Sequence, residues 1–107
     1  MIQTPELSPA ISHRLVPADS TAYECRGFVY RDEDNRCCAY ATRLPGVYGE
    51  GDTEEQAFND LCDAFVFALE TYGESGTKTP WRDGFRRPDL TGNEYWAVVH
   101  VKKTAVS

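Results

Sequence analysis

Residues 44–72 read LPGVYGEGDTEEQAFNDLCDAFVFALETY, and this stretch decides the fold. It begins with Pro45-Gly46, a turn signal, because proline pre-sets φ at the first central position of a turn and glycine accepts a positive φ at the second. Residues 47–48 can then extend as a short strand before two glycines loosen the chain. The remainder has the spacing of one long helix, and the residues before it would supply strands for that helix to cover.

The start of the helix can be capped in two registers. Asp52 with Glu55, or Thr53 with Gln56, could form a capping box, in which side chains bond the free amides of the first turn. The sequence leaves both registers open. The acidic first turn suits the positive end of the helix dipole. Gly73 follows the last periodic residue and marks the expected end of the helix.

Helical periodicity divides this helix into an apolar and a polar face. The apolar face comprises Ala57, Phe58, Leu61, Cys62, Phe65, Ala68, Leu69 and Tyr72. The polar face carries Gln56, Asn59, Asp60, Asp63 and Glu70. A rotation of about 100° per residue places Phe67 on the polar face. It is either a single exposed apolar residue, which needs no explanation, or an anchor for a partner.

Two stretches before the helix are predicted to pair as a β-hairpin. Residues 23–31, YECRGFVYR, and 36–44, RCCAYATRL, are rich in β-forming residues, and Asp34-Asn35 between them tolerates turn geometry. In the second strand one face carries Cys38, Tyr40, Thr42 and Leu44, and the other carries Cys37, Ala39, Ala41 and Arg43. Which face meets the helix stays open, although the two small alanines would let a helix approach closely.

Residues 94–103, EYWAVVHVKK, form the clearest strand, because apolar side chains alternate along it. The chain thus divides into an irregular, proline-bearing arm, residues 1–20, and one domain, residues 21–107. Within the arm, residues 11–16 could pair as an edge segment. The domain has the order β-β-β-α-β, an α+β fold in which one long helix covers a small mixed sheet. We expect the third strand, the helix and the fourth strand to form a right-handed crossover.

No element of the sequence is left to cover the sheet face away from the helix. Because two-layer packing requires an apolar sheet face to be buried, we expect self-association or a partner there, with the last strand as the candidate edge.

Residues 73–93 form a long connection rich in glycine and proline. Such loops are often functional or mobile. Trp81 and Phe85 are expected to pin part of it to the domain. Arg82, Arg86 and Arg87 beside them resemble a phosphate-binding cluster, but the protein is acidic and has no repeat or recognition helix.

Composition and charge limit the classes of function. A chain of 107 residues with 41% apolar content is expected to form one globular domain. No apolar run has membrane-spanning length and residues 1–15 lack the apolar stretch of a signal peptide, so we expect a cytoplasmic protein and no membrane partner. Residues 44–77 contain eight acids and no Lys or Arg, in a chain of net charge -6. This acidic surface either keeps the protein soluble or attracts a basic partner.

The sequence offers little for catalysis or metal binding. The four cysteines, Cys25, Cys37, Cys38 and Cys62, form no CxxC spacing, and the only histidines are His13 and His100. A zinc site is therefore not expected, and the cysteines are interpreted as buried, reduced packing residues. Glu24 and the acids of the turn after the first strand do not form the carboxylate cluster that a two-metal nuclease needs. We expect no catalytic residue, no metal and no cofactor.

The stretch that begins at Tyr30 resembles the HicB antitoxin family. Members carry a strand, an acidic turn, a second strand ending in Leu-Pro-Gly, and Gly-x-Thr-x-x-Glu-Ala at the start of the helix. The corresponding residues here are Arg31-Asp32-Glu33-Asp34, Leu44-Pro45-Gly46 and Gly51-Asp52-Thr53-Glu54-Glu55-Gln56-Ala57. The resemblance covers residues 28–72, and less closely Pro80 and the last strand.

This resemblance implies a partial RNase H-like fold, β-β-β-α-β, and a non-enzymatic antitoxin that binds and neutralises a small basic HicA-like ribonuclease toxin. An acidic, helix-bearing protein would suit such a toxin electrostatically. The sequence departs from the family in having Thr42-Arg43 where Pro-Asp is usual and Gln56 where Glu is usual. Typical members also continue into a DNA-binding domain, whereas this sequence ends at Ser107, so direct DNA binding is not expected.

Two functions follow as hypotheses. The first is the antitoxin of a type II toxin–antitoxin pair, which would contact its toxin through Asp60, Asp63, Phe67 and Glu70 on the outer helix face. The second is a stand-alone oligomeric adaptor or regulatory module of the same fold, with no toxin partner. The first predicts a basic partner encoded next door and no activity of its own, and the second predicts stable homo-oligomers and no such neighbour. We expect the chain to form a homo-oligomer.

Overall fold

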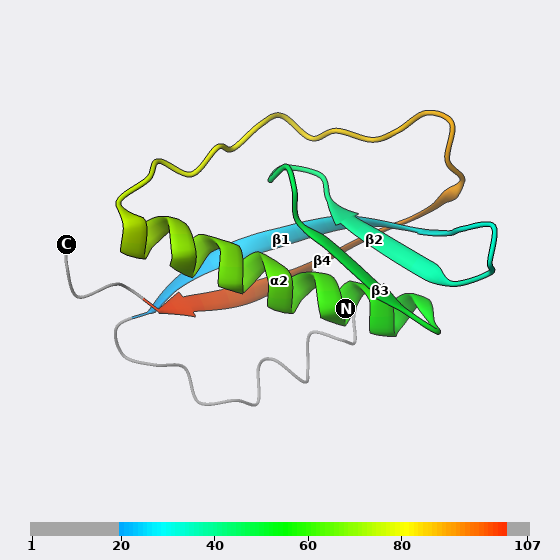
Figure 1. Ribbon diagram of the computed structural model, residues 1–107, viewed down its shortest axis with the longest axis horizontal. Coiled ribbons are helices and arrows are strands. Elements are labelled where there is room, and N and C mark those ends of the chain that lie inside the picture. The colour runs from blue at the N-terminus through cyan, green and yellow to red at the C-terminus, as the bar shows by residue number, and fades with distance from the viewer. Residues whose placement is uncertain (1–19, 103–107) are drawn as a thin grey trace.

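The computed structural model describes residues 20–102, and it contains a four-stranded sheet covered on one face by a long helix (Figure 1). The elements are β1 (Ser20–Arg31), β2 (Cys37–Ala41), β3 (Tyr48–Gly51), α2 (Glu54–Ser75) and β4 (Gly92–Lys102). The strands lie in the order β3-β2-β1-β4. The predicted α+β class and the β-β-β-α-β order are confirmed.

The sheet is antiparallel throughout, so the expectation of a mixed sheet with a right-handed crossover is wrong. β1 pairs antiparallel with both β2 and β4, and β2 pairs antiparallel with β3. The physical reason lies in the connection after the helix. After β3, α2 runs back toward the end of the sheet where β3 began, and a short loop there would start a last strand parallel to β3. Instead, residues 76–91 run back along the whole molecule (Figure 1). β4 therefore starts at the end of the sheet where β1 stops.

The caps of α2 resolve the open question of register. Thr53 is the N-cap, and its hydroxyl accepts a hydrogen bond from the backbone N–H of Gln56 at 3.1 Å. The Gln56 side chain in turn accepts from the backbone N–H of Asp52 at 2.9 Å. At the other end Gly73 does not stop the helix as expected. The left-handed cap is Gly76, φ 73°, whose N–H donates to the carbonyls of Gly73 and Tyr72, which satisfies groups that the last turn leaves free.

The core lies between α2 and the inner face of the sheet. Ala39 and Ala41 belong to it, which settles that the face of β2 carrying Cys37 and these alanines meets the helix. The helix sits closest to β3, because a Cβ placed on Gly49 would lie 2.6 Å from the carbonyl oxygen of Ala57. The glycines of β3 thus belong to the strand and admit the helix, rather than loosening the chain as expected.

The outer face of the sheet is partly covered by the connection, which corrects the expectation that nothing covers it. The Phe85 ring packs on Tyr40 with ring centroids 6.3 Å apart, and the Arg87 N–H donates to the Tyr40 hydroxyl at 2.8 Å. The Arg86 guanidinium lies 4.7 Å from the centroid of the Phe28 ring, which is fully buried. The expectation that Trp81 and Phe85 pin the connection is confirmed, since the Trp81 ring packs on Tyr23 and Phe65.

Other expectations fall outside the described residues. The arm, residues 1–20, lies there except for Ser20, which begins β1, and so does the edge segment expected at residues 11–16. The boundary between arm and domain stays a prediction. Within residues 20–102 no helix is long and apolar enough to cross a membrane.

Candidate functional site

The residues predicted to contact a partner lie along the outward side of α2. Asp60, Asp63, Phe67 and Glu70 recur at helical spacing on the side of α2 opposite its buried residues; the first three are exposed and Glu70 is half-buried. The helix itself covers one face of the sheet (Figure 1). Phe67 is 70% exposed, the highest value for a large apolar side chain among the described residues. We call these four residues the acidic stripe. Their exposure makes contact with a partner physically feasible, and their role stays a prediction.

The part of the chain that the structure describes supplies no cation that balances the negative charge of the acidic stripe. No cation among residues 20–102 forms an ion pair with Asp60, Asp63 or Glu70. Asp60 accepts a hydrogen bond from the backbone N–H of Glu50 at 3.0 Å, which ties the stripe to β3. In contrast, Arg36 lies near two acids before the helix, 2.6 Å from Asp52 and 3.8 Å from Glu50. The carboxylates of the acidic stripe therefore have no ion-pair partner among the described residues, and they lie on the same side of α2 as Phe67.

The first turn of α2 is bound to β4 through one carboxylate. Glu54 accepts hydrogen bonds from the Tyr95 hydroxyl at 2.7 Å and from the Asn93 amide at 3.1 Å. Burial, together with this hydrogen bond, raises the pKa of Tyr95 to about 12. Glu54 is thus engaged within the fold and does not add to the acidic stripe.

The acids considered for a nuclease have structural partners. Asp32 accepts hydrogen bonds from the backbone N–H groups of Asp34 at 2.9 Å and Arg36 at 3.0 Å. The bond from Arg36 has the largest effect, and both bonds lower the pKa of Asp32, because hydrogen bonds to a carboxylate favour its charged form. Glu24 pairs with Arg26 at 2.9 Å. Within residues 20–102 no group of three or more His, Cys, Asp or Glu side chains is placed to hold a metal ion.

The cysteines are free thiols with packing roles. Cys25 and Cys37 are buried, while Cys38 and Cys62 are half-buried, so full burial holds for two of the four. A hydrogen bond with Cys62 and burial raise the pKa of Cys25. Because the thiolate is the nucleophile, a raised pKa makes a thiol unreactive. Cys38 lies on the outer face near Asp32, with its sulfur 3.6 Å from the carboxylate.

The three arginines of the connection do not form a phosphate-binding cluster. Arg82 packs on Phe85 and donates to backbone carbonyls, Arg86 reaches Glu94 at 3.5 Å, and Arg87 pairs with Asp89 at 2.8 Å. Each guanidinium therefore already has its own partner within the fold.

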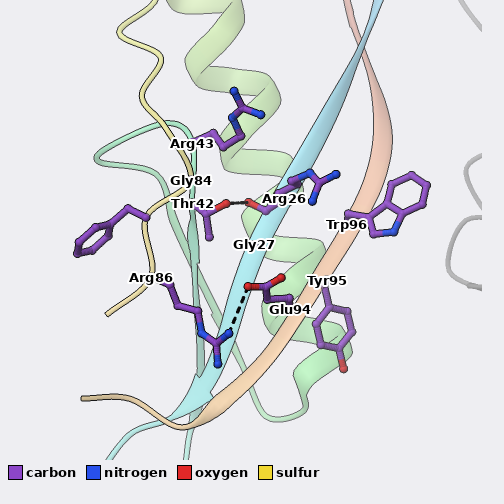
Figure 2. A pocket seen from close by; sticks show the side chains of 10 residues that line it. Arg26, Gly27, Thr42, Arg43, Gly84, Arg86, Glu94, Tyr95 and Trp96 are labelled. Carbon is purple, nitrogen blue, oxygen red and sulfur yellow. Dashed lines mark hydrogen bonds and ion pairs between the residues drawn. The ribbon is translucent and has the colours of Figure 1, made fainter. Parts of the chain in front are cut away.

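A cavity of about 390 Å³ opens beside the connection on the outer face (Figure 2). Arg26, Arg43 and Arg86 line it, together with Glu94 and Trp96. Figure 2 shows the Arg43 side chain pointing away from Arg86, which reaches toward Glu94. The guanidinium groups do not converge, and Arg26 is already paired with Glu24. The cavity is not built to hold an anion.

The sequence predicted the last strand as a candidate edge for association, but it did not indicate which apolar residues of β4 stay exposed. Trp96 is 56% exposed and Val98 is 39% exposed, on the face away from α2. Their alternation with buried residues was visible in the sequence. Their exposure depends on where the connection stops covering the sheet, which sequence periodicity does not encode.

The architecture defines the class of this chain: an α+β domain with one helix on a four-stranded antiparallel sheet. It is similar to the crystal structure of the N-terminal domain of the Burkholderia pseudomallei antitoxin HicB, with a TM-score of 0.54 and 22% sequence identity. The likeness covers 75% of this chain and 99% of that domain. No protein-family model matches the sequence, and no curated protein matches it. The predicted HicB-like fold is thereby confirmed.

Proposed function

We propose that this protein is the antitoxin of a type II toxin–antitoxin pair and neutralises a small, basic, HicA-like ribonuclease toxin by direct binding in the cytoplasm. The observation that carries the proposal is the acidic stripe, an uncompensated row of carboxylates around a 70% exposed phenylalanine, on a fold shared with a HicB antitoxin domain. The protein acts without catalysis or cofactor, and it does so as a homo-oligomer.

The charge of the acidic stripe favours a basic partner, and the exposed Phe67 favours an apolar contact with it. A ribonuclease that binds RNA must present a positive surface, since phosphate contacts supply much of the affinity for nucleic acid. Complementary charge accelerates the encounter of two proteins and fixes their orientation. An exposed aromatic side chain surrounded by charged residues has the composition of an interface anchor within a polar rim. Phe67 would supply the apolar contact and Asp60, Asp63 and Glu70 the orientation.

Co-expression tests the proposal directly. The chain is produced with the small basic protein encoded beside it, and the complex is measured by size-exclusion with light scattering. We expect a stable complex and a partner that is toxic when expressed alone. Absence of binding, or a harmless partner, would refute the antitoxin role.

The stripe is tested with Phe67→Asp, which we expect to weaken toxin binding at least tenfold, about 1.4 kcal/mol, without unfolding the domain. The matched control is Tyr48→Asp, because Tyr48 is similarly exposed at 66% but lies on β3. Toxin binding should be unchanged in the control. Equal effects of the two substitutions, or unchanged binding with Phe67→Asp, would contradict the assignment.

The alternative function is a stand-alone oligomeric adaptor or regulatory module with no toxin partner. The exposed Trp96 and Val98 favour it, because they offer a surface for assembly that does not involve the acidic stripe. This alternative predicts stable homo-oligomers and no toxic neighbour.

A further inference from the structure

Strand β4 is an edge strand of the sheet that residues 20–102 form. It pairs with β1 from Ser20↔Lys102 to Tyr30↔Gly92, and no strand among residues 20–102 pairs with its other side. The opposite edge, β3, has four residues, two of them glycine. A long edge strand without proline presents a row of free amide and carbonyl groups, which is a template for pairing with another chain. β4 has eleven residues and no proline.

Apolar side chains line this edge on the outer face. Trp96 and Val98 lie on the same side of β4, with Arg26 and Glu24 as their neighbours on β1. The Arg26 guanidinium pairs with the Glu24 carboxylate at 2.9 Å, so the charge next to the apolar residues is balanced. The edge therefore carries exposed apolar area without a net charge that would repel a copy of itself.

The charges of β4 are complementary when two copies of the strand pair antiparallel. Two antiparallel copies related by a two-fold axis at Val98 place Glu94 opposite the partner's Lys102 at both ends of the contact. Trp96 then lies opposite the partner's His100. Both Glu94 and Lys102 are exposed, and opposite charges directly across an antiparallel pair stabilise it. Such an isologous contact is the commonest kind in symmetric dimers.

Neighbouring registers lose this complementarity. An axis at Ala97 would place Lys102 opposite the partner's Gly92, which has no side chain. An axis at Val99 would place Glu94 beyond Lys102, the last residue of β4. Only an axis at Val98 pairs the two charges at each end while keeping the apolar residues together.

The same two-fold axis is compatible with the residues of β4 on the inner face of the sheet. Ala97 would lie opposite the partner's Val99, and Tyr95 opposite the partner's Val101. These residues already lie on the side that α2 covers, with Ala97, Val99 and Val101 in the core. An axis perpendicular to the sheet therefore keeps both helices on one face. The two four-stranded sheets would continue into one sheet of eight strands.

We propose that two copies of this chain pair antiparallel through β4, about a two-fold axis at Val98, with Glu94 of each copy facing Lys102 of the other. The inference rests on the proposed function only in that it assigns an interface to the homo-oligomer stated there. It requires no toxin, and the chain alone suffices to test it.

Charge reversal tests the register. The full chain is measured by sedimentation equilibrium as wild type, Glu94→Lys, Lys102→Glu and the double variant. Each single reversal puts like charges together twice per dimer, so we expect the dimer dissociation constant to rise about tenfold or more. The double variant restores opposite charges and should return to within about threefold of wild type. Arg86→Gln is the control, because it breaks the ion pair with Glu94 inside one copy without changing the contact.

A second variant tests the axis itself. Val98→Lys places two lysines opposite each other at the centre of the contact, and an exposed strand position tolerates the change. We expect a folded monomer. A wild-type monomer at high concentration, a double variant as weak as the singles, or a dimer that survives Val98→Lys would each overturn the proposal. A wild-type monomer would also remove the homo-oligomer from the proposed function. None of the three outcomes decides toxin neutralisation, because toxin capture by the Val98→Lys variant is measured separately.

Discussion

Replacing Gly49 by alanine should disturb the packing of α2 against β3. A Cβ at this position would lie 2.6 Å from the carbonyl oxygen of Ala57 and 2.8 Å from the Cα of Leu61, and it would also meet the Leu61 backbone nitrogen. These are backbone atoms of α2, so no side-chain rotation relieves the contact. The helix must move away from β3, and the neighbouring hydrogen bond from the Glu50 N–H to Asp60 should weaken with it.

The magnitude follows from two opposing effects. Overpacking a core costs about 1–3 kcal/mol of unfolding free energy. Because Gly49→Ala meets backbone atoms that cannot rotate away, we expect its overpacking cost to be about 3 kcal/mol. Removing a glycine from a strand returns about 0.5–1 kcal/mol, because the unfolded chain loses less freedom on folding. The net loss in unfolding free energy is about 2 kcal/mol, which lowers Tm by about 8–16 °C in a domain of this size.

Urea denaturation followed by circular dichroism measures the loss in unfolding free energy. Amide hydrogen exchange at Glu50 reports on the contact between β3 and α2, because the Glu50 N–H donates to Asp60. The matched control is Gly84→Ala, because a Cβ there meets nothing within 4 Å. We expect the control to be neutral or to gain up to about 1 kcal/mol. If Gly49→Ala lost less than about 0.5 kcal/mol, or left the Glu50 exchange rate unchanged, the argument for close helix–strand contact would be refuted.

Three further predictions concern single polar contacts. Thr53→Ala removes the N-cap bond to Gln56 and should lower the unfolding free energy by about 1 kcal/mol in urea denaturation, whereas Thr53→Ser should keep most of it. Because the pKa of Tyr95 is raised to about 12, its neutral form stabilises the fold fully below about pH 10, and this contribution declines as the pH rises toward 12. Tyr95→Phe should therefore flatten the loss of Tm between about pH 10 and 12, and an unchanged slope would contradict the assignment. The lowered pKa of Asp32 means that its stabilisation is present above the pKa of a free Asp, about 3.9, and is lost as the pH falls below it. Asp32→Ala should be less stable than wild type at pH 7, and the difference should shrink on acidification.

Local chemistry made much of this fold predictable. The β-turn at Asn35 and the turn at Gly46 have the positive φ values, 65° and 81°, that their residue types indicated. The helix was visible because its apolar residues recur at 3.6-residue spacing, and its core members Leu61 and Phe65 are buried as that pattern requires. These features depend on residues close in sequence, which a single sequence displays directly.

What the sequence did not predict depends on contacts between distant residues. The direction of β4 follows from how far residues 76–91 travel, and their path is fixed by bonds such as the Phe85 N–H to the Thr42 carbonyl at 2.8 Å. Helical or strand periodicity carries no information about that path. The cover over Phe28 and Tyr40 was missed for the same reason: Phe85 was expected to pack on the domain, but the sequence did not indicate that it and Arg86 lie on the outer face of the sheet.

The acidic stripe and the β4 edge would be compatible in one assembly. The stripe lies on α2, which covers one face of the sheet (Figure 1), whereas β4 is the strand at one edge of the sheet. A two-fold axis perpendicular to the sheet would keep both helices on one face, so both stripes would point in the same direction. Each copy could then hold one toxin, and linking the two sites would strengthen capture of any partner that is itself dimeric. Light scattering of the complex distinguishes this arrangement. Two toxins per dimer of this chain agree with separate surfaces, while a toxin that releases the monomer from the dimer would show that β4 is the toxin site.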